Sequence, residues 1–312
     1  MTKDKIIKDI YNDEISLGDL FNAIWKGKYL IISSIALLSV ISIFYSINLP
    51  NIYKSEAILN PSVQKNNIQQ SFGNYSSLAS LAGINLSPGN NLRKTSEAIA
   101  KLQSFVFFEK EILPYIFLPD LMALDYWNST NNVMVYDNQI YNIKSNKWVR
   151  DFSYPFSQIP SAQESYSEFK KIIKLSEDSE TGFITLSIKH QSPIVAKEWL
   201  NIIINNLNNL YRIKEKAEAK DSLAYLSQKI ALTNYTEIRQ VLSQLIQAET
   251  QKLTLIEANK DYIFKFIEPP IVMETHSEPN RSLICIIGAF IGAILGIVVV
   301  LYQYFYKQRA IK

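Results

Sequence analysis

Two stretches without a charged residue, one near each end of the chain, constrain the fold most. They are Tyr29–Ile47 and Leu283–Leu301, and each is 19 residues long. As helices they would be about 28 Å long, close to the roughly 30 Å hydrocarbon core of a bilayer. They therefore predict two membrane spans, although a chain that is 47% hydrophobic with a net charge of +3 resembles a soluble protein on average. Two spans argue against a soluble cytosolic enzyme and a simple secreted domain.

The residues around these stretches predict the topology. Acidic residues precede the first stretch and no small-residue cleavage site follows it, so we interpret it as an uncleaved anchor rather than a signal peptide. Lys26 and Lys28 precede the first span, and Lys307 and Arg309 follow the second, which places both termini in the cytoplasm by the positive-inside rule. The predicted order is a cytoplasmic segment 1–28, a span 29–47, an outer domain 48–282, a span 283–304 and a cytoplasmic tail 305–312.

The position of the single cysteine excludes disulfides as a source of stability for the outer domain. Cys285 falls within the second predicted span, so the outer domain cannot contain a disulfide. Its stability must come from a hydrophobic core or from assembly. The N-x-S/T sequons of this Asn- and Ser-rich chain are expected by chance and do not indicate glycosylation. We expect instead a Gram-negative bacterial inner-membrane protein whose domain 48–282 faces the periplasm.

A long helical segment dominates the outer domain. Ser192 and Pro193 form a helix start, and neither Gly nor Pro occurs between Ile194 and Ile267. Apolar residues recur with a period near 3.5, which predicts a helix over about 193–258 that packs along a partner helix and forms a homo-oligomer. The alternative is a broken helix pair that folds back as a monomeric hairpin. The predicted oligomer face consists of Leu207, Leu210, Leu223, Leu226, Ile230, Leu242 and Leu245.

Shorter patterns predict the rest of the outer domain. Residues 52–59 and 261–268 alternate as strands that could pair near the membrane, and residues 183–189 form a third strand after a turn at Gly182. Helical spacing occurs in 163–175 and in a segment that Ser96 could cap and that ends before Pro114. Residues 119–162 show no clear period and are expected to be an irregular surface excursion.

Two further patterns concern the second span and the segment before it. Gly288, Gly292 and Gly296 share one helix face, where the missing side chains would allow another helix to approach closely. We expect subunits to assemble through this face as well as through the long helices. Upstream, a linker contains Pro269, Pro270 and Pro279. Because proline fixes φ, we interpret this linker as a stiff coupling between the outer domain and the span.

The sequence offers little for catalysis. His190 and His276 have no metal-ligand spacing to a cysteine or to another histidine, and no phosphate-binding glycine loop occurs. Basic residues are dispersed, which argues against nucleic-acid binding. The acidic run 177–180 precedes a strand and is expected to be a solvated turn. We therefore expect a protein that is not an enzyme and has no cofactor, no metal site and no catalytic residues.

Several segments together resemble the Wzz polysaccharide co-polymerases, the chain-length determinant proteins. At the C-terminal end these are Phe264–Pro270, Pro279–Arg281 and the three glycines of the second span. At the N-terminal end they are Ile15–Leu20, Trp25–Tyr29 and Pro50–Ala57. Between them, segments 77–84, 96–104 and 181–187 also match, so the resemblance runs from about residue 14 to 304.

The resemblance implies a fold class and a function. It implies two transmembrane helices, a membrane-proximal α/β domain and a long helix extending into the periplasm. It further implies a homo-oligomeric, non-catalytic scaffold that sets the modal length of a lipid-linked polysaccharide made by a Wzy-type polymerase. Related proteins with a cytoplasmic kinase domain continue well past the second span, whereas this chain stops eight residues after Tyr304, which favours an O-antigen-type polymer. The competing class is a two-span periplasmic sensor or export adaptor.

Overall fold

The computed structural model describes residues 17–61 and 89–310, and the chain divides into two compact units. The helical unit contains the residues up to Asn51 and those from Ser277 onward, and the α/β unit contains Ile52–His276. The predicted fold class is confirmed: an apolar helix lies near each end of the chain, and a mixed α/β domain with a long helix lies between them in the sequence. Segment 77–84 of the resemblance lies outside the described residues.

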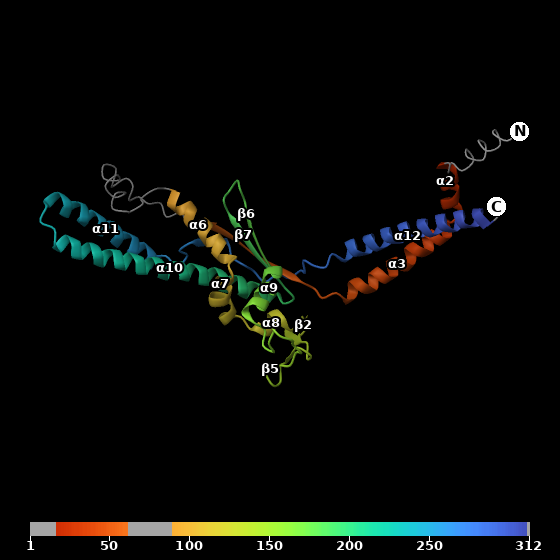
Figure 1. Cartoon of the computed structure of the whole chain (residues 1–312), viewed down its shortest axis with the longest axis horizontal. Coiled ribbons are helices and arrows are strands. Elements are labelled where there is room, and N and C mark those ends of the chain that lie inside the picture. Colours follow the sequence, from red (N-terminus) through yellow and green to blue (C-terminus); the bar gives the residue numbers. More distant parts are fainter. Residues whose placement is uncertain (1–16, 62–88, 311–312) are drawn as a thin grey trace. The chain divides into compact units, whose positions relative to one another are not determined.

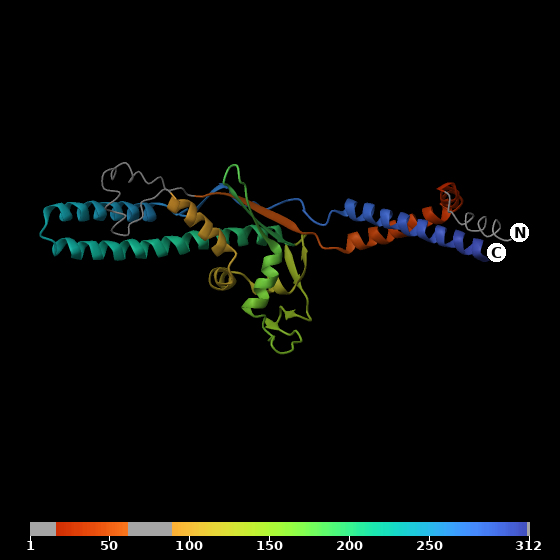
Figure 2. The ribbon, with the colours of Figure 1, turned by 45° about the horizontal axis from the view of Figure 1, so that its top comes forward.

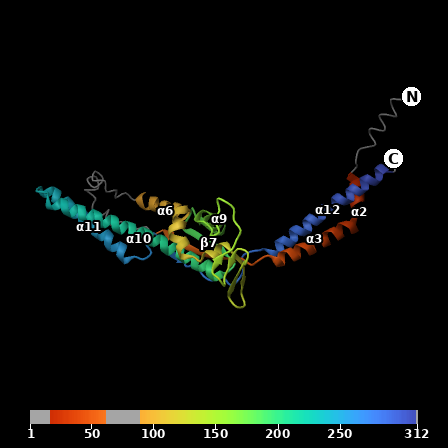
Figure 3. The same ribbon diagram turned by 60° about the horizontal axis from the view of Figure 1, so that its bottom comes forward.

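The helical unit is formed by α2 (Leu17–Lys26), α3 (Lys28–Asn48) and α12 (Arg281–Ala310). Both α3 and α12 are long and apolar enough to cross a membrane. With 21 and 30 residues they would be about 31 and 45 Å long. They lie side by side (Figures 1 and 3), and α2 also packs against α12.

The α/β unit is organised on a four-stranded antiparallel sheet. Its strands are β1 (Tyr53–Pro61), β6 (Ile173–Glu177), β7 (Ile184–His190) and β8 (Phe264–Glu268), in the order β6-β7-β1-β8. The expected pairing of residues 52–59 with 261–268 is confirmed by β1 and β8. Alternation in β7 buries Ile184, Leu186 and Ile188 completely, which gives the sheet the apolar face that a helix can cover.

Helix α10 (Pro193–Ala231) packs against β1 and β7 of this sheet. It begins as its sequence predicts, because the Ser192 hydroxyl accepts a hydrogen bond from the Val195 N–H and proline occupies the first turn. Its first half forms the centre of the core, which also receives α9 (Ala162–Ile172). The fully buried side chains of α10 in this core include Leu200, Ile203 and Leu207.

The single helix predicted over 193–258 is wrong in its extent. The chain leaves the helix after Ala231 and starts α11 (Thr236–Ala258) at residue 236. The two helices pack side by side as a hairpin (Figure 2), so the fold-back alternative describes this segment. Apolar residues that recur every 3.5 residues indicate that a helix packs against another helix. Here that second helix is the next segment of the same chain.

Two further predictions need correction. The helix expected to run to Pro114 ends with α6 (Gly89–Leu102), and Ser104 starts a compact series of turns by accepting a hydrogen bond from the Phe107 N–H at 3.2 Å. That series comprises α7 (Phe105–Phe107), the π-helix η1 (Phe108–Ile112), the 3-10 helix η2 (Leu113–Tyr115) and α8 (Leu118–Met122).

The stretch 119–162 is not wholly irregular, because it contains two antiparallel hairpins. The first is β2 (Leu124–Asn128) with β3 (Val133–Tyr136), and the second is β4 (Tyr141–Asn142) with β5 (Lys147–Trp148). Edge-to-face contacts join Tyr141 of the second hairpin to Phe117 and to Tyr136 of the first hairpin. Tyr141 also contacts Trp148 across its own hairpin. Such short strands leave no periodicity long enough to detect in the sequence.

Candidate functional site

The three glycines of α12 lie where α3 approaches most closely. A Cβ atom on Gly292 would lie 2.8 Å from the Ile35 Cα, and one on Gly296 would lie 2.9 Å from the Ile31 Cα. Distances this short leave no room for a side chain. The glycines therefore let the backbones of α3 and α12 touch.

Serine side chains of α3 complete this contact. The Ser34 hydroxyl donates a hydrogen bond to the Gly292 carbonyl oxygen at 3.0 Å, and a Cβ on Gly288 would lie 2.7 Å from the Ser42 Cβ. As the contacts on α12 advance from Gly288 to Gly296, those on α3 move back from Ser42 to Ile31, so the two helices run antiparallel. We call this contact the glycine face.

The partner of the glycine face corrects one expectation. We expected subunits to assemble through these glycines, but the structure fills the face with α3 of the same chain. Small residues at such a seam allow close van der Waals packing and interhelical hydrogen bonds, which hold helices together in a lipid environment. The glycine face therefore closes the membrane anchor of one chain.

The predicted oligomer face is also used within the chain. Leu207 and Leu210 pack in or against the core of the α/β unit, while Leu226 and Leu245 are buried at 7% and 4% exposure. The structure thus assigns these side chains to the core and the hairpin rather than to a neighbouring subunit. The remaining members, all half-buried, are Leu223, Ile230 and Leu242.

Other apolar side chains on the hairpin do face outward. Leu232 and Tyr235, in the turn between α10 and α11, are 72% and 71% exposed. Tyr225 and Ile238, on the adjoining helical turns, are 59% and 49% exposed. The end of the hairpin therefore carries an uncovered apolar surface, which the predicted oligomer face did not include.

A buried polar side chain that the sequence did not reveal joins α10 to the sheet. Asn208 is 3% exposed. Its Oδ1 accepts hydrogen bonds from the N–H groups of Ile263 and Phe264, and its Nδ2 donates to the Phe264 carbonyl oxygen, all at 2.9 Å. Because β8 is an edge strand, these bonds pair backbone groups that the sheet leaves open. The only sequence signal is a polar residue on an otherwise apolar helix face.

Glu215 forms the centre of a second buried contact, at the base of the hairpin. Its carboxylate pairs with the Lys94 ammonium at 2.7 Å and accepts a hydrogen bond from the Tyr262 hydroxyl at 2.9 Å, with Lys252 at 3.6 Å. Burial alone would raise the pKa of Glu215, but these hydrogen bonds and positive charges outweigh it and hold the pKa below its usual value. The contact ties α6, α10, α11 and the residues before β8 together.

His190 is the last residue of β7 and joins a buried polar cluster. Its Nδ1 accepts a hydrogen bond from the Ser192 N–H at 3.0 Å, and its Nε2 faces the Asp120 carbonyl oxygen at 3.2 Å. Burial lowers the pKa of His190. Burial also raises the pKa of the Asp120 carboxyl, although this group accepts a 2.6 Å hydrogen bond from the Tyr136 hydroxyl. The cluster fixes α8 and β3 to the end of β7.

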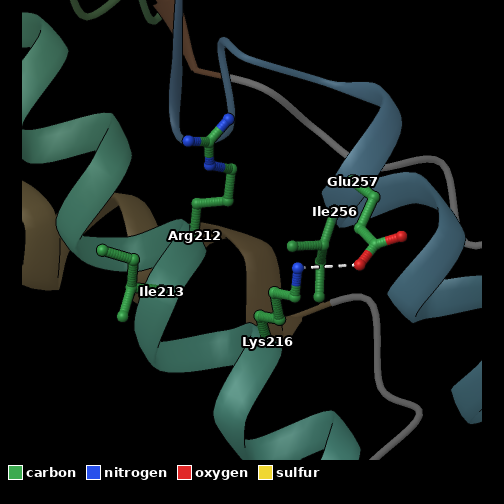
Figure 4. A pocket seen from close by; sticks show the side chains of 5 residues that line it. All are labelled: Arg212, Ile213, Lys216, Ile256 and Glu257. Carbon is green, nitrogen blue, oxygen red and sulfur yellow. Dashed lines mark ion pairs between the residues drawn. The ribbon is translucent and has the colours of Figure 1, made fainter.

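An open hollow of about 380 Å³ lies between α10 and α11 (Figure 4). Its lining includes an ion pair between Lys216 and Glu257 at 2.8 Å. Arg212 donates a hydrogen bond to the Asn209 side chain at 3.1 Å, and apolar contacts come from Ile213 and Ile256. In the part of the chain that the structure describes, no group of three or more His, Cys, Asp or Glu side chains could hold a metal ion.

The predicted proline linker falls in both units. Pro269 and Pro270 end β8, and Pro270 is buried. The Ser55 hydroxyl then donates a hydrogen bond to the Ile271 carbonyl oxygen at 2.9 Å, which holds the chain beside β1 after the prolines. Pro279 lies in the helical unit, two residues before α12 begins. The structure thus fixes the start of the linker, and its stiffness stays a prediction.

Comparison with known proteins gives a match to one family model and resemblances to solved structures, among them two polysaccharide co-polymerases. Residues 13–110 match the model of the Wzz family, described as chain length determinant protein. A full-length bacterial polysaccharide co-polymerase is 14% identical over 94% of this chain and 99% of its own, with a TM-score of 0.41. A fragment of WzzB, a polysaccharide co-polymerase from Salmonella Typhimurium, is 13% identical over 73% of this chain and 100% of its own, with a TM-score of 0.30.

No curated protein sequence matches the chain. The family match covers α2, α3, β1 and α6, which belong to both units of the structure. It therefore includes one half of the glycine face and the lysine that pairs with Glu215. Over these residues the chain is similar to the Wzz family of chain length determinant proteins.

Proposed function

We propose that this protein regulates the chain length of a bacterial polysaccharide as a non-catalytic co-polymerase. The observation that carries the proposal is the match of residues 13–110 to the chain length determinant family. The substrate would be an O-antigen-type lipid-linked polysaccharide, and the enzyme that extends it would be a Wzy-type polymerase. The protein would act as a homo-oligomeric scaffold that determines how long polymer and polymerase stay engaged.

The antiparallel anchor supports the topology that this function needs. Because α3 and α12 run in opposite directions, Lys26 and Lys28 lie at the same end of the pair as the residues that follow Tyr306. Those following residues include Lys307 and Arg309. Clustering of basic residues at one end of a helix pair favours the cytoplasmic side for that end. We infer that both termini face the cytoplasm of a Gram-negative cell, and that the α/β unit faces the periplasm from the inner membrane.

The hairpin supports the scaffold role. Its outward apolar residues, Leu232 and Tyr235, are more than two-thirds exposed, and uncovered apolar surface on a protein of this kind marks a site of interaction. In a homo-oligomer, this surface would meet a neighbouring subunit or the polymerase. Contact between subunits would then use the outside of the hairpin, since its inside is already filled by Leu226 and Leu245.

Complementation of a deletion strain tests the proposal. A strain that lacks its own chain-length regulator is expected to produce polysaccharide of random length, and expression of this chain should restore a modal band on a silver-stained gel. A strain that carries the empty plasmid is the control. Deletion of this chain's own gene should likewise leave polymer of random length. Complete loss of polymer in that second strain would instead indicate a synthase or transporter, and restoration of export without a modal band would favour the sensor or adaptor alternative.

A further inference from the structure

Helix α2 has two unlike faces. Ala23 is 1% exposed on the face that packs against α12. Phe21 and Trp25 are 66% and 63% exposed on another side, and their spacing of four residues places them in one row. Their rings stack with centroids 6.2 Å apart. The structure thus leaves a pair of large aromatic side chains uncovered directly before the first apolar helix.

The chain changes direction at the junction between α2 and α3, so that α2 lies across the end of the pair formed by α3 and α12. Gly27 is the one residue between the two helices, and a Cβ at this position would lie 3.0 Å from the Val300 Cβ. Glycine therefore allows the turn to sit against α12. Figures 1 and 3 show α2 turned away from the direction of α3 and α12. A helix that crosses the axis of two spans at their end runs along the membrane surface.

A lysine continues the aromatic row. The Lys28 Nζ lies 5.2 Å from the centre of the Trp25 ring and 5.4 Å from that of Tyr29, and Tyr29 is 76% exposed. Since Lys28 begins α3, its ammonium lies where the apolar span begins, at the depth of lipid headgroups. Cation–π contact holds the ammonium beside the rings and leaves its N–H groups for an anionic oxygen. Lys26 is exposed on a different side of α2.

We propose that α2 is an interfacial anchor that inserts Phe21 and Trp25 into the headgroup layer and binds the phosphate of an anionic phospholipid through Lys28. The chemistry of the row favours lipid over a protein partner, because aromatic rings beside a lysine at the end of a span match the polarity gradient of a bilayer surface. The proposal requires α3 to be a span. It does not require a role in polysaccharide length, and the following tests use no polymer.

The first test measures which side of α2 faces lipid. In full-length protein with Cys285→Ala, a nitrobenzoxadiazole (NBD) label is placed at Phe21→Cys or at Asn22→Cys, two exposed positions of α2. Position 21 belongs to the aromatic row, where Trp25 is retained, whereas Asn22 lies about 100° further around the helix, on the side of Lys26. In phosphatidylcholine–phosphatidylglycerol proteoliposomes, lipid-borne spin labels should quench the label at position 21 and aqueous iodide the label at position 22. Equal quenching of both by iodide, or shielding of position 21 from both quenchers by a second copy, would overturn the proposal.

The second test separates the two lysines. Quenching at position 21 is compared between spin-labelled phosphatidylglycerol and spin-labelled phosphatidylcholine. The preference for phosphatidylglycerol should fall about fivefold in Lys28→Gln, because one lysine near an anionic surface contributes about 1 kcal/mol. Lys26→Gln removes the same charge and should retain most of the preference. Equal loss in both variants, or no loss in Lys28→Gln, would refute a phosphate site at Lys28. Carbonate extraction checks separately that each variant is inserted.

Discussion

Replacing Gly292 with leucine should break the contact that closes the anchor. Even a Cβ would lie 2.8 Å from the Ile35 Cα and 3.0 Å from the Ser34 carbonyl oxygen, whereas carbon atoms in contact lie about 3.5–4.0 Å apart. The helices must therefore separate by about 1 Å before the rest of the leucine is placed. Overpacking of this kind costs about 1–3 kcal/mol. Loss of the Ser34–Gly292 hydrogen bond adds about 0.6 kcal/mol, so the pair should be destabilised by about 2–4 kcal/mol.

Two measurements follow this substitution. Thermal denaturation of the purified protein in detergent should show a lower midpoint for Gly292→Leu, and in the complemented deletion strain the modal band should shift or disappear while total polymer is retained. Val298→Leu is the matched control, because it enlarges a side chain of the same helix that is 56% exposed. An unchanged midpoint would refute the packing argument. A lowered midpoint with unchanged banding at equal protein level would show that length control does not depend on this contact.

Three further predictions concern the α/β unit, and circular-dichroism unfolding of purified protein checks each. Leu226→Ala should destabilise the hairpin by about 2–4 kcal/mol because its side chain is buried, while Leu232→Ala, at 72% exposure, should change stability by less than about 0.5 kcal/mol; equal effects would contradict the assignment of the hairpin interior. Glu215→Gln should cost about 1–3 kcal/mol and weaken the acid sensitivity of the protein, since the lowered pKa of Glu215 stabilises the fold at neutral pH and this stabilisation is lost as the pH falls below 4.5; an unchanged acid transition would argue against the Lys94 pairing. The lowered pKa of His190 means that the unfolded chain binds a proton more readily, so stability should decrease as the pH falls below 6.5, and His190→Gln should reduce that slope; an unchanged slope would assign it to other groups.

The sequence predicted those parts of the fold whose signal is local. Absence of charge located both apolar helices, and strict alternation located β1, β7 and β8. Ser192 and Pro193 placed the start of α10 correctly because a cap and a first-turn proline depend only on their immediate neighbours. The glycine pattern indicated a close helix contact, and α3 lies there in the structure.

Features that depend on distant partners were not predictable in the same way. The period of α10 and α11 shows that their leucines need a partner, but it does not distinguish a neighbouring subunit from the same chain folding back at residues 232–235. That turn contains neither Gly nor Pro. Asn208 and Glu215 resemble ordinary polar positions until the structure brings Phe264, Lys94 and Tyr262 to them. The contribution of such residues to stability depends on whether they are buried, and burial depends on the whole fold.

The closed glycine face has a consequence for biogenesis. A newly inserted chain carries both halves of the seam, α3 with Ser34 and α12 with Gly292, so it can complete this contact without waiting for another copy. The small residues that would otherwise attract unrelated helices are then hidden. What remains toward the lipid is a bulky surface that includes Ile286, Phe290 and Val298. Each chain can therefore mature as a self-contained two-helix anchor. In the homo-oligomer that we propose, the number of copies could vary without any change to the anchor itself.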